Sequence, residues 1–518
     1  MNTQVEIIKK GEESVQESSF IDDKKYTSFK SYLKHIAEKF RLWDPNATYR
    51  LISHLDADGI SAAAIMIKLL TLMNRKYTVS ILPYLDKPTL EKLKKEEYEH
   101  YIFTDLGSGS YNTIKEMFDK EFVLILDHHA LHEKNENKDY DALLQELKLK
   151  ANENPKILHA NPHMFDIDGG NEISGSGVSF LFSRKIHRDI DSVAHVAIIG
   201  AMGDVQEDHG FKQLNNEILD IAKEQKTIKV IQGLRLFGVQ TRALHKVLEY
   251  CSEPYLPGVT GSESGAVQFL YNIGINPRSD HGYKKLIHLS DNDMQKLVTG
   301  LVLKMQNNIE AHKIIGPVYI IKNERKESPT RDAKEFATLL NACGRLQKAS
   351  LGIGVCLNIS SMKKKALELL SSYKMEIVKS LKWVENKMQG SMKSINDSTG
   401  GEVYTLSNAI IINAKTDIRP TMIGTITSIF SRSNLVKDEM FLLGLSRYED
   451  GNTKISLRSK NANEDLKSIV EKVVNKLEKG EAGGHSKAAG AVIPTMEEPL
   501  FLELIMKEFE NIDNKIRA

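Results

Sequence analysis

The sequence has few of the features that mark a secreted or membrane protein. Its three cysteines, Cys251, Cys343 and Cys356, form an odd set without C-x-x-C spacing. This argues against a disulfide framework and a thiolate zinc site, and it favours a reducing compartment. No apolar run approaches the length of a membrane span, and the polar residues 1–23 contain no apolar core of a signal peptide. We therefore expect a cytoplasmic protein without a membrane partner.

An excess of charge of one sign is also missing, because 70 basic and 69 acidic residues leave a net charge of +1. Without a global basic field, any contact with nucleic acid must come from a local patch or cleft, which argues against a protein that only coats DNA. The chain is long enough to form more than one domain. Its 518 residues, 41% of them hydrophobic, suffice for two or three domains with sizeable cores.

Short apolar runs alternate with helical patterns in the first third of the chain. The runs with the length and composition of buried strands are Tyr49–Ser53, Thr78–Pro83, Tyr101–Thr104 and Phe122–Leu126. After the first run, Gly59 permits a tight turn, and Ser61 is a candidate cap of the alanine-rich helix that follows. Strands and helices in this order predict an α/β fold with a doubly wound parallel sheet.

Acidic residues and histidines follow these apolar runs. They are Asp56 and Asp58, then Asp105, then Asp127-His128-His129, and finally Asp204 after the run Val193–Met202. We expect them at one edge of the sheet, where the carboxylates repel each other unless cations neutralise them. Carboxylates with imidazoles suit two divalent ions, Mn²⁺ or Mg²⁺. The alternative is that each Asp caps the helix after its strand.

Two glycine-rich segments are candidate anion sites. Ser174–Gly177 precedes a predicted helix, so its N–H groups can hold a phosphate, although an ordinary loop is an equally good interpretation. Gly483-Gly484-His485 is followed by Ala488-Ala489-Gly490. Adjacent glycines let the backbone approach a phosphate closely, and His485 can supply a charged donor. We therefore treat both segments as candidate phosphate contacts.

The later half of the chain has its own pattern. Residues from about 212 look helical and charged, whereas a second βα-like lobe is expected to begin near Gly316 with a strand at Val318–Ile321. In Lys454–Arg458, Ile455 and Leu457 alternate with polar residues, which predicts a strand with one buried face. We thus expect a helical bridge between two lobes.

In combination, these motifs resemble the DHH phosphoesterases, most closely the RecJ-like single-strand exonucleases of archaea. The motifs that carry the resemblance are Asp56-Ala57-Asp58-Gly59, Asp105, Asp127-His128-His129, Gly203-Asp204 and Gly483-Gly484-His485-x-x-Ala488-Ala489-Gly490. The resemblance implies a two-lobed enzyme. Its parts would be an N-terminal lead-in and helix (1–48), a DHH catalytic domain (49–210), a helical bridge (211–315) and a smaller α/β substrate-binding domain (316–518).

The resemblance also implies roles for single residues. Asp56 would hold a first ion and Asp58 a second, Asp105 would bridge both, and His128 and Asp204 would complete the second. Asp127 would orient the imidazoles. The implied substrate-binding residues are His129, Ser176, Arg458, Gly483, Gly484 and His485. Where some relatives have a ligand histidine, four residues before the first Asp, this chain has Ile52, so His54 is a candidate ligand in its place.

The activity implied is two-metal hydrolysis of single-stranded DNA, or RNA, to mononucleotides in replication or repair, with 5′-to-3′ polarity favoured over 3′-to-5′. One alternative is a phosphodiesterase for short oligonucleotides or cyclic dinucleotides. Another is a replication-fork scaffold without nuclease activity, which the intact acidic motifs argue against. Single-stranded nucleic acid, the GINS replication complex and a Hef-type helicase are the partners that the resemblance implies.

Overall fold

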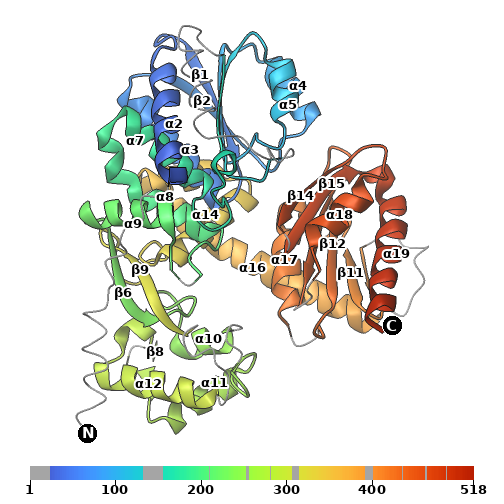
Figure 1. Cartoon of the computed structure of the whole chain (residues 1–518). Helices are drawn as coiled ribbons and strands as arrows, with labels where there is room; N and C mark the ends of the chain where they lie inside the picture. The colour runs from blue at the N-terminus through green and yellow to red at the C-terminus, as the bar shows by residue number, and fades with distance from the viewer. Residues whose placement is uncertain are drawn as a thin grey trace. The chain divides into compact units, whose positions relative to one another are not determined.

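The structure is a computed structural model that describes residues 24–131, 156–208, 210–251, 256–280, 282–305, 314–390, 401–433, 436–460, 464–485 and 487–517 (Figure 1). Residues 1–23 of the predicted N-terminal lead-in lie outside the described residues. Backbone contacts divide the chain into two compact units. The first comprises Met1–Ile231, Pro317–Arg325 and Thr330–Thr338, and the second comprises Gln232–Gly316, Lys326–Pro329 and Leu339–Ala518. None of the described helices is long and apolar enough to span a membrane.

The first unit contains a five-stranded sheet in the order β2-β1-β3-β4-β5. Its strands are β1 (Thr48–His54), β2 (Lys76–Leu82), β3 (His100–Thr104), β4 (Phe122–Leu126) and β5 (Ile157–Ala160). Every neighbouring pair is parallel, which confirms the predicted doubly wound parallel sheet. The sequence also predicted four of the five strands. All five run in one direction, so their carboxyl ends share one edge.

Helices cover both faces of this sheet. On one face, α4 (Lys87–Lys94) and α5 (Tyr111–Met117) pack through Leu90 and Ile114 against Tyr101, Phe103 and Ile125. On the other, α3 (Ala57–Leu72) contacts β1, and α7 (Gly175–Ile186) and α8 (Ala194–Gly203) contact α3. The sequence of α3 is mostly apolar and only weakly amphipathic, which is typical of a helix that is buried between neighbours.

The remaining elements of this unit complete the cover. They are α2 (Lys24–Arg41), η2 (Pro162–Phe165), η3 (Arg188–Val193) and α9 (Gln213–Glu224). The apolar run Val193–Met202, which we grouped with the strand ends, forms α8 instead. Such a run is too short for periodicity to separate a buried strand from a buried helix. Asp204 therefore follows a helix, not a strand.

Buried residues between Leu234 and Ile314 form a core of their own. The elements from residue 228 to residue 390 are β6 (Ile228–Leu234), α10 (Leu244–Glu249), α11 (Glu263–Asn272), β7 (Arg278–Ser279), β8 (Gly282–Tyr283), η4 (Leu286–His288), α12 (Asp291–Lys304), β9 (Ile315–Ile321), α14 (Ala333–Arg345), α15 (Ala349–Cys356) and α16 (Ser360–Gly390). The predicted strand Val318–Ile321 belongs to β9. This strand pairs with β6 and takes no part in the C-terminal sheet.

The C-terminal sheet is mixed and has the order β10-β11-β12-β13-β15-β14. Its elements are β10 (Glu402–Thr405), β11 (Ala409–Asn413), α17 (Pro420–Ser431), β12 (Phe441–Arg447), β13 (Asn452–Ser459), α18 (Leu466–Val474), β14 (Glu481–His485), β15 (Ala488–Pro494), η5 (Thr495–Glu497) and α19 (Glu498–Arg517). Ile455 and Leu457 are buried in a core with residues of α18 and α19, as the alternation in β13 predicted. α17 contacts β12 and β13.

Candidate metal centre

The turn between β1 and α3 supplies the first candidate ligands. Asp56 is the N-cap of α3, and its Oδ1 accepts a hydrogen bond of 3.0 Å from the Gly59 N–H. The capping alternative is therefore correct for Asp56, whereas Ser61, the predicted cap, lies inside α3. The second oxygen of Asp56, Oδ2, is 2.9 Å from Nδ1 of His54. A Cβ at Gly59 would overlap the His54 carbonyl oxygen, so this close turn requires glycine.

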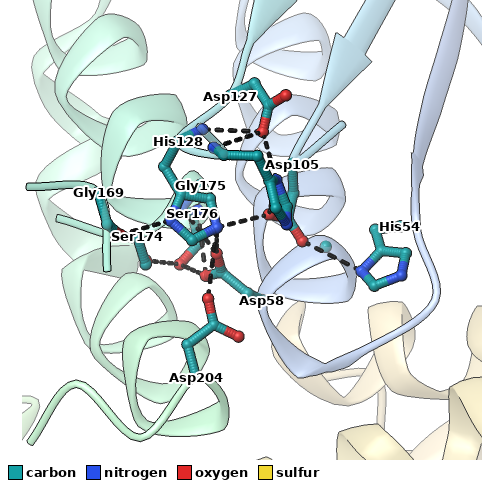
Figure 2. A network of polar contacts seen from close by, with 12 residues as sticks. His54, Asp58, Asp105, Asp127, His128, Gly169, Ser174, Gly175, Ser176 and Asp204 are labelled. Atoms are coloured by element: carbon teal, nitrogen blue, oxygen red, sulfur yellow. Dashed lines mark hydrogen bonds and ion pairs between the residues drawn. The ribbon is translucent and has the colours of Figure 1, made fainter. Parts of the chain in front are cut away.

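Asp105 and His128 lie at the ends of β3 and β4, and their side chains meet (Figure 2). Nε2 of His128 is 3.1 Å from Oδ1 of Asp105 and 3.4 Å from Oδ2 of Asp204. Nδ1 of His54 is 3.6 Å from the other oxygen of Asp105. Carboxylates and imidazoles from β1, β3, β4 and the end of α8 thus meet at one point, as the sequence predicted for this edge.

Asp58 is fully buried, and the N-terminus of α7 binds its carboxylate. The Gly175 N–H donates to Oδ2 at 2.6 Å, the Ser176 N–H donates to Oδ1 at 3.1 Å, and the Ser176 hydroxyl also donates to Oδ1 (Figure 2). The prediction that Ser174–Gly177 holds a phosphate is therefore wrong for these N–H groups. Ser176 is itself buried, so we interpret it as a support of Asp58 rather than a contact of substrate.

Asp127 supports the loop that follows β4. It accepts hydrogen bonds from the Ser108 and His128 N–H groups at 2.8 Å each, and it contacts Nδ1 of His129 at 2.7 Å. It orients one imidazole, not both as expected, because Nδ1 of His128 instead contacts the Gly169 carbonyl oxygen at 2.6 Å. The His129 side chain is 45% exposed, which leaves it accessible to a substrate.

The electrostatics of the cluster reflect its crowded carboxylates. Burial, followed by the charge of Asp105, raises the pKa of Asp58 to about 7. Burial, followed by the charge of Asp58, raises the pKa of Asp204 well above its usual value. Burial alone would lower the pKa of His128, but the hydrogen bond to Asp105 and the surrounding carboxylates raise it well above 6.5. The site therefore favours bound positive charge.

These residues fit divalent metal ions. Three groups have ligand atoms within 4.8 Å of one another: His54, Asp56 and Asp105; Asp58, His128 and Asp204; and Asp105, His128 and His129. Both Asp105 oxygens and Nε2 of His128 are buried without a hydrogen bond of good geometry, although the two residues are close. Buried carboxylates rarely stay unsatisfied, and hard or borderline cations prefer this donor set. His54 lies in the cluster, so the geometry permits its role as a ligand.

Sequence reasoning missed several residues that hold these ligands in place. Asn161 follows β5 and donates from Nδ2 to the Ser108 hydroxyl at 2.8 Å and to the His129 carbonyl oxygen at 2.9 Å. Gln206 donates from Nε2 to the carbonyl oxygen of Gly169 at 2.9 Å, the same oxygen that His128 contacts. A polar residue directly after a predicted strand was a usable signal for Asn161. The chain offered no such signal for Gln206.

The predicted substrate residues of the second unit share one part of the C-terminal sheet. In register, Gly483 of β14 pairs with Gly490 of β15, which pairs with Ser456 of β13, and His485 pairs with Ala488, which pairs with Arg458. The side chain of His485 lies outside the described residues. Gly484 has φ of 126°, and a Cβ added at this position would overlap the Ala488 carbonyl oxygen. A Cβ added at Gly483 would point into open space.

Three cationic side chains, Arg458, Lys454 and Arg345, influence one another's charge at this part of the sheet. The sequence had indicated only Arg458 as a substrate residue. Burial and the charge of nearby Arg345 lower the pKa of Arg458 to about 10, and burial followed by Arg458 lowers that of Lys454 to about 8. Nε of Arg345 is buried without a hydrogen-bond partner. Within the described residues, no carboxylate forms an ion pair with any of the three. By contrast, Arg447 pairs with Glu498 at 2.9 Å.

Three family models match the chain in order. The DHH family N-terminal domain matches residues 50–203, the DHH-CID domain matches 236–316, and the DHHA1 domain matches 407–511. The chain belongs to the DHH family. An uncharacterized protein of Methanocaldococcus jannaschii, MJ0831, is 30% identical over 462 residues, which cover 88% of this chain and 92% of that protein. DHH membership confirms the resemblance and supports a phosphoester hydrolase.

Solved structures share the fold of this DHH protein. RecJ of Thermus thermophilus in complex with Mn²⁺ matches with a TM-score of 0.50 and 14% identity over 92% of this chain. The match covers 54% of the RecJ chain, so this chain spans about half of it. CDC45 of Entamoeba histolytica matches with a TM-score of 0.56 and 14% identity, over 93% of this chain and 98% of that one. At this identity the likeness concerns the fold alone, which is RecJ-like.

Proposed function

We propose that the protein is a metal-dependent exonuclease that hydrolyses single-stranded DNA, and RNA as a second substrate, to mononucleotides. The observation that carries the proposal is the cluster of Asp56, Asp58, Asp105, His128 and Asp204. In it, the buried oxygens of Asp105 and the buried Nε2 of His128 have no hydrogen-bond partner and match the ligands of divalent ions. The proposed polarity is 5′-to-3′. The proposed setting is cytoplasmic DNA replication or repair, with GINS or a Hef-type helicase as the implied partner.

The chain's own residues suit a hydrolysis in which no protein nucleophile takes part. His54, Asp56 and Asp105 would hold one ion, while Asp58, Asp105, His128 and Asp204 would hold the other. Two Mn²⁺ or Mg²⁺ ions bound there supply an activated water molecule and neutralise charge on the phosphate. His129 is exposed, and Asp127 fixes its ring through Nδ1. Burial alone would lower the pKa of His129, but the charge of Asp127 and the hydrogen bond to it raise that pKa. The protonated ring can then donate from Nε2 to a phosphate oxygen.

The second unit supports a polyanionic substrate. Lys454, Arg458 and Arg345 influence one another's charge, and no described carboxylate pairs with them. Half-buried cations without counter-charges favour an anion such as a nucleic-acid phosphate. The register of β13, β15 and β14 brings the exposed Gly483 to the same part of the sheet. We therefore propose Arg458, Gly483, Gly484 and His485, with Lys454 added, as substrate contacts.

A replication-fork scaffold without nuclease activity is the second candidate function. The likeness to CDC45 over 98% of that chain, at a TM-score of 0.56, favours it. Against it, a scaffold has no need of four clustered carboxylates, two of them buried, whose mutual repulsion destabilises the fold without a cation. The short-oligonucleotide phosphodiesterase keeps the same metal chemistry and differs only in substrate length.

The test is digestion of a single-stranded oligonucleotide with Mn²⁺, labelled at the 5′ end and, separately, at the 3′ end. We expect early release of labelled mononucleotide from the 5′ label, slow attack on a matched duplex, and no release by Asp105→Asn. The control variant Asp189→Asn changes a carboxylate that is 70% exposed and is expected to retain full activity. Cleavage restricted to oligomers of a few nucleotides would favour the phosphodiesterase. Absence of cleavage with any divalent ion would favour the scaffold.

A further inference from the structure

In the described part of the chain, the most exposed aromatic side chains lie in one stretch. Among the Phe, Tyr and Trp residues that the structure describes, those with high exposure are Tyr250 at 58%, Tyr271 at 50% and Tyr283 at 42%. They belong to the end of α10, to α11 and to β8, three elements of the second unit that are labelled in Figure 1. Single exposed apolar residues need no explanation, but three large rings in 34 residues of sequence are a feature of the surface.

Two of the three exposed rings, those of Tyr250 and Tyr283, have a cation beside them. The guanidinium of Arg242 lies 5.1 Å from the Tyr250 ring centre, and that of Arg278 lies 5.4 Å from the Tyr283 ring centre. Arg278 also donates to the Tyr283 hydroxyl at 3.4 Å, and Tyr271 is close enough to act on its charge. In the described part of the chain, no carboxylate forms an ion pair with Arg278. Stacking on arginine holds an exposed tyrosine in a fixed orientation.

Two consecutive residues of α10, the buried His245 and the half-buried Lys246, lie between the Tyr283 and Tyr250 rings. The His245 ring lies 4.2 Å from the Tyr283 ring, and the next residue, Lys246, lies 5.8 Å from the Tyr250 ring. Glu249 and Glu263 pair with Lys246 at 2.8 Å each, so its charge is largely neutralised. We call Tyr250, Tyr271, Tyr283, Arg242 and Arg278 the tyrosine surface. Its unpaired positive charge comes mainly from Arg278.

We propose that the tyrosine surface is a second binding site for single-stranded nucleic acid, separate from the metal centre and from the C-terminal sheet. Aromatic rings with neighbouring cations bind single strands because every base can stack and every nucleotide carries a phosphate. A protein partner would demand an apolar centre. Among the described residues, the large aliphatic side chains exposed nearest in sequence, Ile231, Val302 and Leu303, belong to β6 and α12 and not to α10, α11, β7 or β8, the elements around the rings. The nature of the ligand rests on the proposed function. The surface would retain a long strand between successive cleavages.

The experiment measures binding of a fluorescent 30-nucleotide single strand to the full chain by anisotropy, in EDTA so that no metal-dependent hydrolysis occurs. We expect Tyr250→Ala, Tyr271→Ala and Tyr283→Ala each to weaken binding about 5-fold or more, the range that stacking of one base gives. The corresponding Tyr→Phe variants retain the ring and are expected to bind nearly as the wild type does. Arg278→Ala is expected to reduce the salt dependence of binding by about one unit of slope.

Matched controls separate this site from general surface effects. Met375→Ala and Val378→Ala truncate exposed apolar side chains of α16 in the same unit and are expected to leave affinity unchanged. All variants are expected to melt as the wild type does, because the changed side chains are exposed. Hydrolysis of a dinucleotide with Mn²⁺ is expected to stay at the wild-type rate, whereas degradation of the 30-nucleotide strand slows.

The outcomes distinguish this inference from the proposed function. Wild-type affinity in the three Tyr→Ala variants would overturn the inference and would leave the proposed nuclease activity unaffected. This result would also be obtained if the surface binds a protein instead of a nucleic acid. Loss of affinity in these variants supports the inference even if no strand is ever cleaved, a result that would overturn the nuclease alone. Equal losses in the α16 controls would also overturn it.

Discussion

The Nδ1 atom of His128 lies 2.6 Å from the carbonyl oxygen of Gly169. A carbonyl oxygen only accepts hydrogen bonds, so Nδ1 must carry the proton, and the lone pair of neutral His128 is on Nε2. That atom lies within 3.7 Å of Asp58, Asp105 and Asp204. The contact thus selects the tautomer that can bind a metal ion among these carboxylates, and it makes the Gly169 loop part of the metal centre.

Gly169→Ala is expected to damage the metal centre. The new Cβ would overlap the His128 carbonyl oxygen and lie 2.9 Å from Nε2 of His163, so the loop must move away from His128. We expect Mn²⁺ affinity to fall about 10- to 100-fold, as for other residues that orient ligands. Gly170→Ala is the control, because its Cβ would meet only the Asp168 side chain, at 3.2 Å. Titration calorimetry measures both, and equal affinities would contradict the role assigned to Gly169.

Asp204→Asn is expected to stabilise the metal-free protein while abolishing hydrolysis. Asp204 stands among like charges, and burial raises its pKa, so the neutral amide removes repulsion on the order of 1 kcal/mol. The gain should shrink as the pH falls, because protonation of Asp204 has the same effect. Urea unfolding in EDTA measures it, with the exposed Asp189→Asn as the control. A variant less stable than the wild type would show that the carboxylates do not repel one another.

Lys454→Met is expected to weaken substrate binding more than turnover. Lys454 contributes charge beside Arg458 and Arg345 without a described carboxylate partner, so its loss removes one phosphate contact. We expect KM for a single strand to rise about 5-fold or more and kcat to change little. Steady-state kinetics with Lys479→Met, an exposed lysine of the same unit, provide the comparison. An unchanged KM would remove Lys454 from the proposed site.

Acidification is expected to destabilise the fold partly through His195 in α8. Burial lowers the pKa of this histidine from 6.5 to about 4. Between these values the unfolded chain binds the proton and the folded chain does not, so stability is full above pH 6.5 and is lost as the pH falls towards 4. From pH 7.5 to 5 the loss is on the order of 1–2 kcal/mol.

His195→Gln is expected to lack this part of the pH dependence. Unfolding by urea at pH 7.5 and at pH 5, in EDTA, gives the difference for the wild type and the variant. Equal differences in the two proteins would show that His195 is not the titrating group.

Local patterns in the sequence predicted the parallel sheet and the edge at which the candidate metal ligands lie. Phe122–Leu126 is β4 to the residue, and Asp105 and His128 follow strands as expected. These features depend on burial and on the period of a strand, which neighbours along the chain determine. The alternation in β13 was readable for the same reason.

Contacts between residues that are far apart in the sequence could not be predicted in this way. Whether the N-terminus of α7 holds a phosphate or the Asp58 carboxylate depends on contacts across 117 positions of sequence. The same applies to Gly169 beside His128, 41 positions away, and to the pairing of β9 with β6. The positive φ of 59° at Val205, directly after Asp204, breaks the local preference of a β-branched residue. Such a departure arises only where the surrounding fold imposes it.

The most direct test of the central claim is a Mn²⁺ titration of the full chain at pH 7.5, followed by calorimetry, with hydrolysis of a single strand measured over the same concentrations. We expect two ions per chain in the wild type, at most one in Asp105→Asn, and hydrolysis that appears only as the second ion binds. Wild-type protein that binds no ion, or Asp105→Asn that binds two and hydrolyses DNA at the wild-type rate, would contradict it.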